Sequence, residues 1–338
     1  MLARLRVMPI MARMRALVVT IDTEEEGRWS SSYPATGNSV GNIACLPRVQ
    51  QVFRRTGAVP TYLVDYPVAS DPAARAILAR FVQDDGSEIG AHLHPWCNPP
   101  FGGNGRTRRD TYPHNLPAAD QRAKLEELCA VLEKGFGSRP LTYRAGRWGF
   151  DHTTVPVLEE MGFTVDTSVT PLWWDRGDGG PAFARAPHRP YRLNRADACR
   201  PGDSTVVEVP MSHLVVGAHG RALEGIVRLT GPAPGLRRVL VGLGLRSLRP
   251  EQHSLSEMRA VADTIAARGL TVFNVMFHSS VALPGATPYA KRAEDVEEFC
   301  RRLEGILDHI VSHLSARPMA LRDVPAFLGA SILSGGAR

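Results

Sequence analysis

Cysteine is scarce in this chain of 338 residues, and its pattern argues against a disulfide framework. The five cysteines are odd in number and form no CxxC pair; they are Cys45, Cys97, Cys129, Cys199 and Cys300. Disulfide-stabilised proteins carry even sets of cysteines and belong to oxidising compartments. We therefore expect a protein of a reducing compartment, and cytoplasmic is our prediction.

Long apolar runs are also missing. No stretch approaches the roughly 20 apolar residues of a membrane span. Prolines and arginines interrupt the most apolar segment, residues 226–245. Residues 1–13 lack the apolar core and the small-residue cleavage site of a signal peptide. We expect no transmembrane segment, and we expect residues 1–13 to be disordered or to precede the true start.

Neither charge sign is present in large excess. Lys and Arg number 40 against 34 Asp and Glu, which gives a net charge of +6. The arginines are scattered, and no basic stretch is interleaved with aromatic residues, so we expect no nucleic-acid partner. A hydrophobic content of 43% is enough for a large core. Without a repeat, linker or composition break, residues 14–330 read as one domain.

Strand and helix patterns alternate along the chain. Strands are predicted at 16–22, 59–66, 87–93, 141–146, 163–169, 204–212 and 270–278. Helices are predicted at 47–56, 72–83, 118–136, 153–161, 255–268 and 294–314. Residues 213–250 give no clear pattern. This alternation is typical of a parallel α/β sheet, and the absence of a GxGxxG turn favours a TIM-like barrel over a dinucleotide fold.

Chemically active side chains follow the predicted strands. In a parallel barrel the active site lies at the carboxyl ends of the strands. These ends carry Asp22, Glu24, Asp65, His92, His94, Arg144, Asp166, Glu208 and His278. Residues two apart on a strand share a face, which holds for Asp22 with Glu24 and for His92 with His94. Two histidines and a carboxylate make up a catalytic zinc site, so we expect one divalent metal ion, with zinc preferred to nickel, cobalt or iron.

Five segments carry a family resemblance. They are VVTIDTEEE (18–26), GSEIGAHLHPW (86–96), YRAGRWGFD (143–151), VDTSVTP (165–171) and NVMFHSS (274–280). In this order and spacing the chain resembles the polysaccharide deacetylases of the NodB-homology group, carbohydrate esterase family four, with most similarity to the WalW subgroup. The resemblance covers about residues 15 to 310. It implies a distorted or incomplete (β/α) barrel of seven or eight strands, and removal of an N-acetyl group from a sugar of a cell-envelope polysaccharide or its precursor.

The resemblance also implies roles for individual residues. Asp22 corresponds to the general base, Arg144 to the arginine that orients it, and His278 to the general acid. The metal ligands correspond to Glu24, His92 and His94. Metal-activated water would then attack the acetyl carbon.

Three departures from the family pattern leave alternatives open. Thr23 separates Asp22 from Glu24, so Asp22 could bind the metal while Glu24 acts as base. The histidines are two apart rather than four, so His114 or Asp65 could replace the second histidine ligand. Gly146-Arg147-Trp148 stands where the family usually has proline and tyrosine. Arg147 and Trp148 are therefore candidates for substrate specificity, and Arg147 suggests an anionic group or a structural ion pair.

Further residues near the strand ends are candidates for contact with a sugar. Trp96, Trp148, Trp173 and Trp174 follow strand ends, where they would stack on sugar faces or pack in the core. Asp65, Asp166 and Glu208 would bond sugar hydroxyls or pair with arginines. Two rival functions stay open: hydrolysis of a non-sugar amide, such as a formyl or cyclic amide, and an inactive carbohydrate-binding homologue.

Overall fold

A computed structural model describes residues 14–27, 29, 33–102, 107–175, 177–231, 233 and 235–333. The expectation for residues 1–13 lies outside these residues. The strands are β1 (Arg15–Thr23), β2 (Pro60–Val64), β3 (Glu88–Leu93), β4 (Thr142–Ala145), β5 (Val165–Asp166), β6 (Tyr191–Arg192), β7 (Val207–Glu208), β8 (His213–Val215), β9 (Leu245–Ser247), β10 (Val272–His278) and β11 (Ala316–Pro318). The α-helices are α1 (Leu46–Thr56), α2 (Tyr66–Ser70), α3 (Pro72–Asp85), α4 (Ala118–Phe136), α5 (Thr154–Glu160), α6 (Gly220–Thr230), α7 (Leu236–Gly242), α8 (Leu255–Ala267), α9 (Ala293–Asp308) and α10 (Val324–Leu333).

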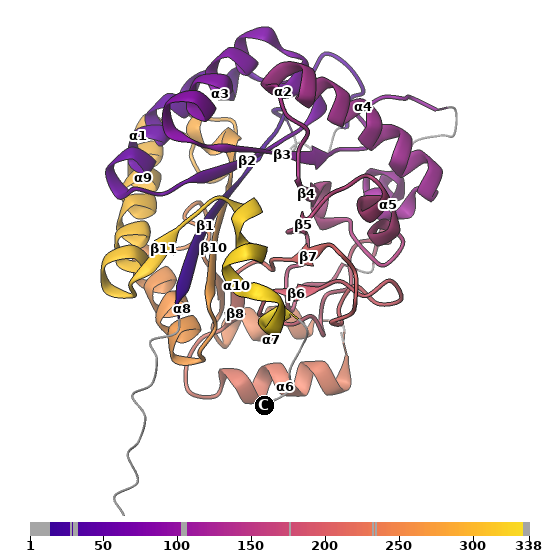
Figure 1. Cartoon of the computed structure of the whole chain (residues 1–338). Coiled ribbons are helices and arrows are strands. Elements are labelled where there is room, and N and C mark those ends of the chain that lie inside the picture. Colours follow the sequence, from indigo (N-terminus) through magenta and orange to yellow (C-terminus); the bar gives the residue numbers. More distant parts are fainter. Residues whose placement is uncertain are drawn as a thin grey trace, which may run out of the picture.

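One curled sheet organises the described chain. Its strand order is β10-β1-β2-β3-β4-β5-β7-β6, with β11 beside β1, and only β6 runs antiparallel to its neighbour. Helices surround the outside of the curl (Figure 1). The Asn274 side chain of β10 donates to Thr167 Oγ1 at 3.0 Å and to the Val209 carbonyl at 3.4 Å, and these residues directly follow β5 and β7 on the other side of the curl. The predicted distorted (β/α) barrel is therefore confirmed.

The alternation of residues on β1 explains the layering. Leu17, Val19 and Ile21 face the helices and belong to the main hydrophobic core. Ala16 and Val18 face the inside of the curl, where Leu321, Val324 and Leu328 from the C-terminal segment pack against them. The inside of the curl is thus filled by apolar side chains at the amino-terminal ends of the strands. The polar side chains of the candidate site lie at the carboxyl ends of the strands.

Local sequence signals set the helix ends. Gly57, Gly86 and Gly137 follow α1, α3 and α4 with φ of 70°, 67° and 77°. These left-handed conformations suit glycine and stop a helix. Ser254 and Glu257 form a capping box at the start of α8. Because these signals are local, the predicted helix bounds lie close to the observed ones.

Strands β5 and β7 are shorter than the predicted ranges 163–169 and 204–212. The Ala145 backbone N–H donates to Ser168 Oγ at 2.8 Å, and the Val169 N–H donates to Glu208 Oε1 at 3.1 Å. Side chains thus take donors that a regular ladder would give to neighbouring carbonyls, so the ladder ends early.

The segment without a clear pattern, residues 213–250, forms an insertion. Strands β8 and β9 pair antiparallel, apart from the main sheet, and α6 and α7 lie between them in the chain. The Leu248 carbonyl accepts the Met276 N–H at 3.0 Å, which ties the segment after β9 to β10. The sequence analysis did not show this, because glycines and prolines divide the segment into short elements.

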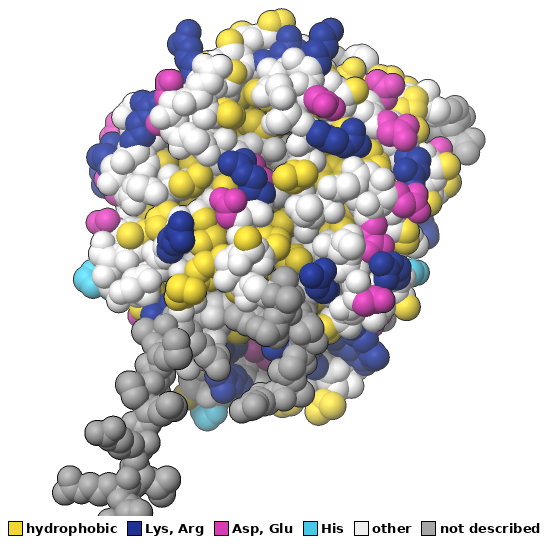
Figure 2. All heavy atoms as spheres, viewed as in Figure 1, with side chains coloured by type: hydrophobic (Ala, Val, Ile, Leu, Met, Phe, Trp, Pro, Cys, Tyr) yellow, Lys and Arg dark blue, Asp and Glu magenta, His cyan; other side chains and the backbone are white. Residues whose placement is uncertain are grey.

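Figure 2 shows Lys and Arg scattered over one face among acidic side chains, and no large basic field lies on that face. Within the described residues, no helix combines the length and apolar character needed to cross a bilayer.

Candidate active site at the carboxyl ends of the strands

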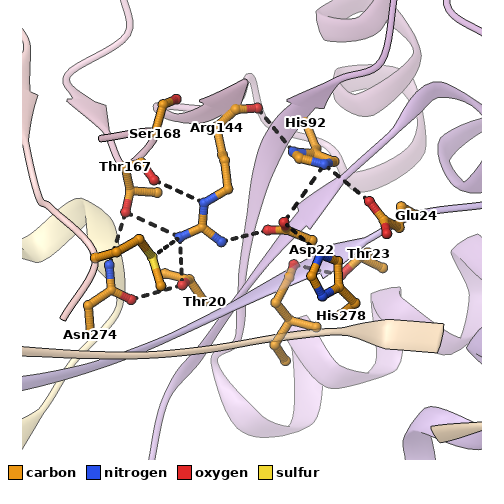
Figure 3. Close-up of polar contacts among 12 residues, drawn as sticks. Thr20, Asp22, Thr23, Glu24, His92, Arg144, Thr167, Ser168, Asn274 and His278 are labelled. Carbon is orange, nitrogen blue, oxygen red and sulfur yellow. Dashed lines mark hydrogen bonds and ion pairs between the residues drawn. The ribbon is translucent and has the colours of Figure 1, made fainter. Parts of the chain in front are cut away.

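The register of the sheet brings the motif residues together. Asp22 on β1 lies beside His278 on β10, and His92 on β3 lies beside Arg144 on β4. These positions are the carboxyl ends of parallel strands, so the side chains meet at one end of the barrel (Figure 3).

Glu24, His92 and His94 form a compact cluster. Glu24 Oε2 lies 3.4 Å from His92 Nε2 and 3.3 Å from His94 Nε2. The exposed fractions of the two histidines are only 1% and 0%. Neither Nε2 atom makes a hydrogen bond to a described residue. Buried donor and acceptor atoms are normally satisfied, so two such nitrogens facing one carboxylate indicate a missing ligand.

The other ring nitrogens fix the orientation of both histidines. His92 Nδ1 lies 3.0 Å from the Arg144 carbonyl oxygen, and His94 Nδ1 lies 2.9 Å from Glu25 Oε2. Both acceptors require a proton on Nδ1, so Nε2 is the nitrogen that each ring directs at Glu24. Trp96 stacks on the His94 ring with centroids 4.2 Å apart and donates to Glu25 Oε1 at 2.8 Å. This is the outer arrangement found around metal-binding histidines.

The charges of the cluster also call for a cation. Burial opposes a charge on His94, but Glu25 and Glu24 on its two sides raise its pKa to about 10. Burial also raises the pKa of Glu25, yet the adjacent His94 and Asp65 hold it at about 2. A position that stabilises a proton this strongly also suits a metal ion. The unpartnered nitrogens, the carboxylate and the charge therefore fit a divalent metal.

Neither alternative second ligand joins the Glu24–His92–His94 group, although Asp65 belongs to a neighbouring group of potential ligands with Glu25, His94 and Cys97. His114 Nε2 is 3.0 Å from the Gly179 carbonyl oxygen, and His114 joins no group of potential metal ligands in the described chain. Asp65 Oδ2 lies 3.9 Å from His94 Nδ1, on the side away from Glu24. Asp65 caps α2 through the Val68 N–H and accepts the Glu25 N–H at 2.7 Å. Burial and the charge of Glu25 raise its pKa well above the usual value.

Asp22 lies between the Arg144 guanidinium and the histidines. Its Oδ1 accepts from Arg144 Nη1 at 2.5 Å, while Oδ2 is 3.6 Å from His278 Nε2 and 4.0 Å from His92 Nε2. Burial raises the pKa of Asp22, but the charge of Arg144, helped by His92 and His278, outweighs it and lowers the pKa below its ordinary value. Asp22 is therefore an ionised carboxylate with one oxygen committed to Arg144 and the other facing the site.

Arg144 is held from several sides, which makes Asp22 rigid. Its exposed fraction is 0%, and Nε donates to the Thr167 carbonyl at 3.0 Å. Nη2 donates to Thr20 Oγ1 at 2.8 Å and to Thr167 Oγ1 at 3.2 Å. Figure 3 shows the guanidinium between these hydroxyls and Asp22. The predicted pairing of Arg144 with Asp22 is present.

The sequence did not point to the residues that hold His278. His278 Nδ1 lies 2.9 Å from Glu251 Oε1, and its backbone N–H donates to Glu251 Oε2 at 3.1 Å. Arg249 forms an ion pair with the same carboxylate. Burial raises the pKa of Glu251, but His278 and Arg249 lower it to about 2. Trp29 packs edge-on against the His278 ring at 5.4 Å. Glu251 is therefore an ionised acceptor that directs Nε2 of His278 toward Asp22.

The residues predicted to contact a sugar fall into two groups, one buried inside the protein and one at the rim of the site. Trp96 is 3% exposed and packs on His94, and Trp148 lies over the Arg144 guanidinium at 5.1 Å. Asp166 accepts from Ser168 Oγ at 2.6 Å, Glu208 accepts the Val169 N–H, and both carboxyls are fully buried. These contacts are internal to the protein.

The rim offers two further features. Arg147, with a left-handed φ of 55°, donates to the Tyr112 hydroxyl at 2.7 Å and lies 3.9 Å from the centre of its ring. Trp173 and Trp174 are half-buried. Beside Trp96 lies a cavity of about 400 Å³, lined also by Phe101, Asp110 and Lys124. Because Trp96 also stacks on His94, this cavity adjoins the cluster and could take part of a ligand.

Comparisons with known proteins support the fold. No family model matches the sequence, and no curated protein matches it. The structure is similar to one described as a glycoside hydrolase/deacetylase from Parabacteroides distasonis, with 12% identity, a TM-score of 0.60, and coverage of 91% of this chain and 69% of that chain. It is also similar to a polysaccharide deacetylase structure from Mycobacterium smegmatis (17% identity, TM-score 0.48, 91% and 94% coverage) and to a CE4 family pseudoenzyme from Bacillus anthracis (8%, 0.43, 92% and 66%). The WalW subgroup stays a prediction. The chain shares its fold with the Parabacteroides distasonis structure, in agreement with the distorted barrel that the resemblance implied.

Proposed function

We propose that the protein is a metal-dependent hydrolase that removes an N-acetyl group from a sugar of a cell-envelope polysaccharide or its precursor. The observation that carries this proposal is the convergence of two unpartnered imidazole nitrogens on Glu24, beside the ionised Asp22. The similar structure described as a glycoside hydrolase/deacetylase is consistent with it. A cytoplasmic precursor is the substrate we favour.

Glu24, His92 and His94 would hold one divalent ion, and zinc suits this donor set. Such an ion supplies Lewis acidity, which lowers the pKa of water and polarises a carbonyl group. The protein supplies the rest. Arg144 keeps Asp22 ionised, and the Asp22 Oδ2 atom faces the cluster, so it can take the proton of a water molecule that attacks the acetyl carbon.

His278 is placed to complete the reaction. Glu251 accepts at Nδ1, so a protonated His278 presents its other N–H at Nε2, 3.6 Å from Asp22 Oδ2. Donation of that proton to the amide nitrogen lets the C–N bond break. One proton of water goes to Asp22 and His278 gives one to the leaving nitrogen, so amide and water become acetic acid and an amine, and the acid then ionises to acetate.

A substrate panel tests this proposal against hydrolysis of a non-sugar amide. N-acetylated sugars and their oligomers, formylated amines and cyclic amides would be incubated with the zinc-loaded protein, and released acetate, formate or ring-opened product measured. We expect acetate from acetylated sugars only. Turnover confined to formylated or cyclic amides would reject the sugar deacetylase. Sugar binding with no turnover of any compound would favour the inactive homologue.

Replacing Glu25 with Gln should weaken metal binding while the ligands stay in place. Glutamine offers one acceptor oxygen, whereas His94 Nδ1–H and Trp96 Nε1–H now use two carboxylate oxygens. Loss of such an outer partner typically costs about 10–100-fold in metal affinity. Zinc titration against a competing chelator measures the effect. Glu26→Gln is the matched control, because Glu26 accepts the Asn42 N–H and does not touch the histidines. Equal zinc affinity in Glu25→Gln and wild type would contradict this role.

A further inference from the structure

The insertion between β8 and β9 has an unusual charge pattern. Residues 217–244, here called the α6–α7 insertion, contain four arginines and a single acidic residue. That residue, Glu224, is 4% exposed, accepts from both Arg268 Nη1 and the Val215 N–H, and so presents no charge to solvent. Arg221 and Arg238 are exposed and form no ion pair within the described chain. Arginines are therefore the charged side chains that the described part of the insertion exposes.

The same insertion exposes aliphatic side chains. Its exposed fractions are 53% for Ile226, 83% for Leu229, 55% for Val239, 48% for Val241 and 51% for Leu243. They form most of the large hydrophobic residues that the described chain leaves exposed. Several exposed apolar residues within one short segment favour an interaction surface, whereas single exposed apolar residues need no explanation.

Other side chains hold the insertion in place. Val227 of α6 and Leu240 of α7 are buried in a small cluster with Leu172. The Arg237 guanidinium stacks on the Trp173 ring at 3.8 Å, which fixes α7 on the body of the protein. Figure 1 shows α6 at one extremity of the molecule. The insertion thus shares a small core with the body of the protein, and a second set of its apolar side chains is exposed.

We propose that the α6–α7 insertion docks the protein on the surface of an anionic lipid bilayer. Aliphatic side chains flanked by arginines, without exposed acid groups, match the acyl boundary and the phosphate headgroups together. A second copy of the chain fits less well, because a two-fold interface would bring the same arginines face to face. The contact is peripheral and independent of the proposed hydrolysis.

Vesicle co-sedimentation of the full chain tests the proposal. Vesicles of phosphatidylcholine would be compared with vesicles that also contain phosphatidylglycerol, at low and at physiological salt. We expect binding only to the anionic vesicles, and weaker binding as salt rises. Leu229→Gln/Leu243→Gln should weaken it about tenfold or more. Arg221→Gln/Arg238→Gln should weaken it about fivefold for each arginine.

The control variant is Leu141→Gln, which removes a leucine that is 41% exposed outside the insertion. It should bind vesicles like wild type, and melting temperatures would establish that all variants are folded. Wild type that fails to bind anionic vesicles would overturn the proposal, as would binding that is the same in Leu229→Gln/Leu243→Gln. Self-association in light scattering that these leucine changes abolish, without vesicle binding, would assign the surface to a second copy instead.

Discussion

Replacing Asp22 with Asn is expected to lower kcat by about 10²–10⁴-fold, the usual contribution of a general base. Asparagine has nearly the same shape, and its oxygen can still accept from Arg144 Nη1, which now lies 2.5 Å from Asp22 Oδ1. The amide cannot take a proton from water. Steady-state deacetylation kinetics on zinc-loaded protein would measure the loss.

The same variant separates the two assignments of the carboxylates. If Glu24 is the ligand, Asp22→Asn keeps the metal and Glu24→Gln loses it. The geometry favours this assignment, because Glu24 Oε2 lies within 3.4 Å of both imidazole nitrogens, whereas Asp22 gives one oxygen to Arg144. Metal lost from Asp22→Asn and retained by Glu24→Gln would exchange the roles. Asp203→Asn, at a side chain 89% exposed, is the control and should keep full activity.

Replacing His94 with Ala is expected to weaken zinc binding by more than the roughly 10–100-fold typical of an outer partner. The change removes one of the two nitrogens that face Glu24 and leaves the charge of Glu25 without its partner. Zinc titration against a chelator would measure the change, with circular dichroism to show that the fold is intact.

His114→Ala is the matched comparison, since this histidine was the alternative ligand. It bonds the Gly179 carbonyl and should keep zinc affinity within the error of the titration. An affinity loss in His114→Ala with none in His94→Ala would show that His114, and not His94, is the second histidine ligand.

Much of the fold could be predicted because its signals are local. The buried run of β1 and the glycine stops after α1, α3 and α4 need only neighbouring residues to act. The insertion at 213–250 could not be predicted, because its short elements are stabilised by contacts with distant residues such as Leu172 and Trp173. The short ladders of β5 and β7 depend on side-chain acceptors, which periodicity does not show.

The candidate site likewise has a part that could be predicted from the sequence and a part that could not. Strand alternation and the motif order bring Asp22, Glu24 and His92 to one end of the barrel, since register follows from parallel pairing. Glu251 was missed because it lies outside every motif. The segment that follows β9 brings it to His278, and this path is visible only in the structure. Glu25 lies inside a motif, but its role depends on the ring orientation of His94, which no spacing reveals.

The roles predicted for the aromatic and acidic residues could be judged only from their contacts in the structure. Trp96 was a candidate platform for a sugar, yet it packs on His94 and donates to Glu25. Asp166 and Glu208 were candidates for hydroxyl contacts, yet their carboxyls are buried. Substrate contact by these residues stays a prediction, and the half-buried Arg147 at the rim is the better placed candidate.

The most direct test of the central claim is elemental analysis of wild type and His92→Ala purified side by side. His92 Nε2 is one of the two buried imidazole nitrogens that face Glu24, and it makes no hydrogen bond to a described residue. We expect about one transition-metal ion per wild-type chain after loading with zinc, and a marked loss in the variant. No metal in wild type after loading, or equal metal in both proteins, would contradict the proposed metal site and leave the inactive carbohydrate-binding protein as the better explanation.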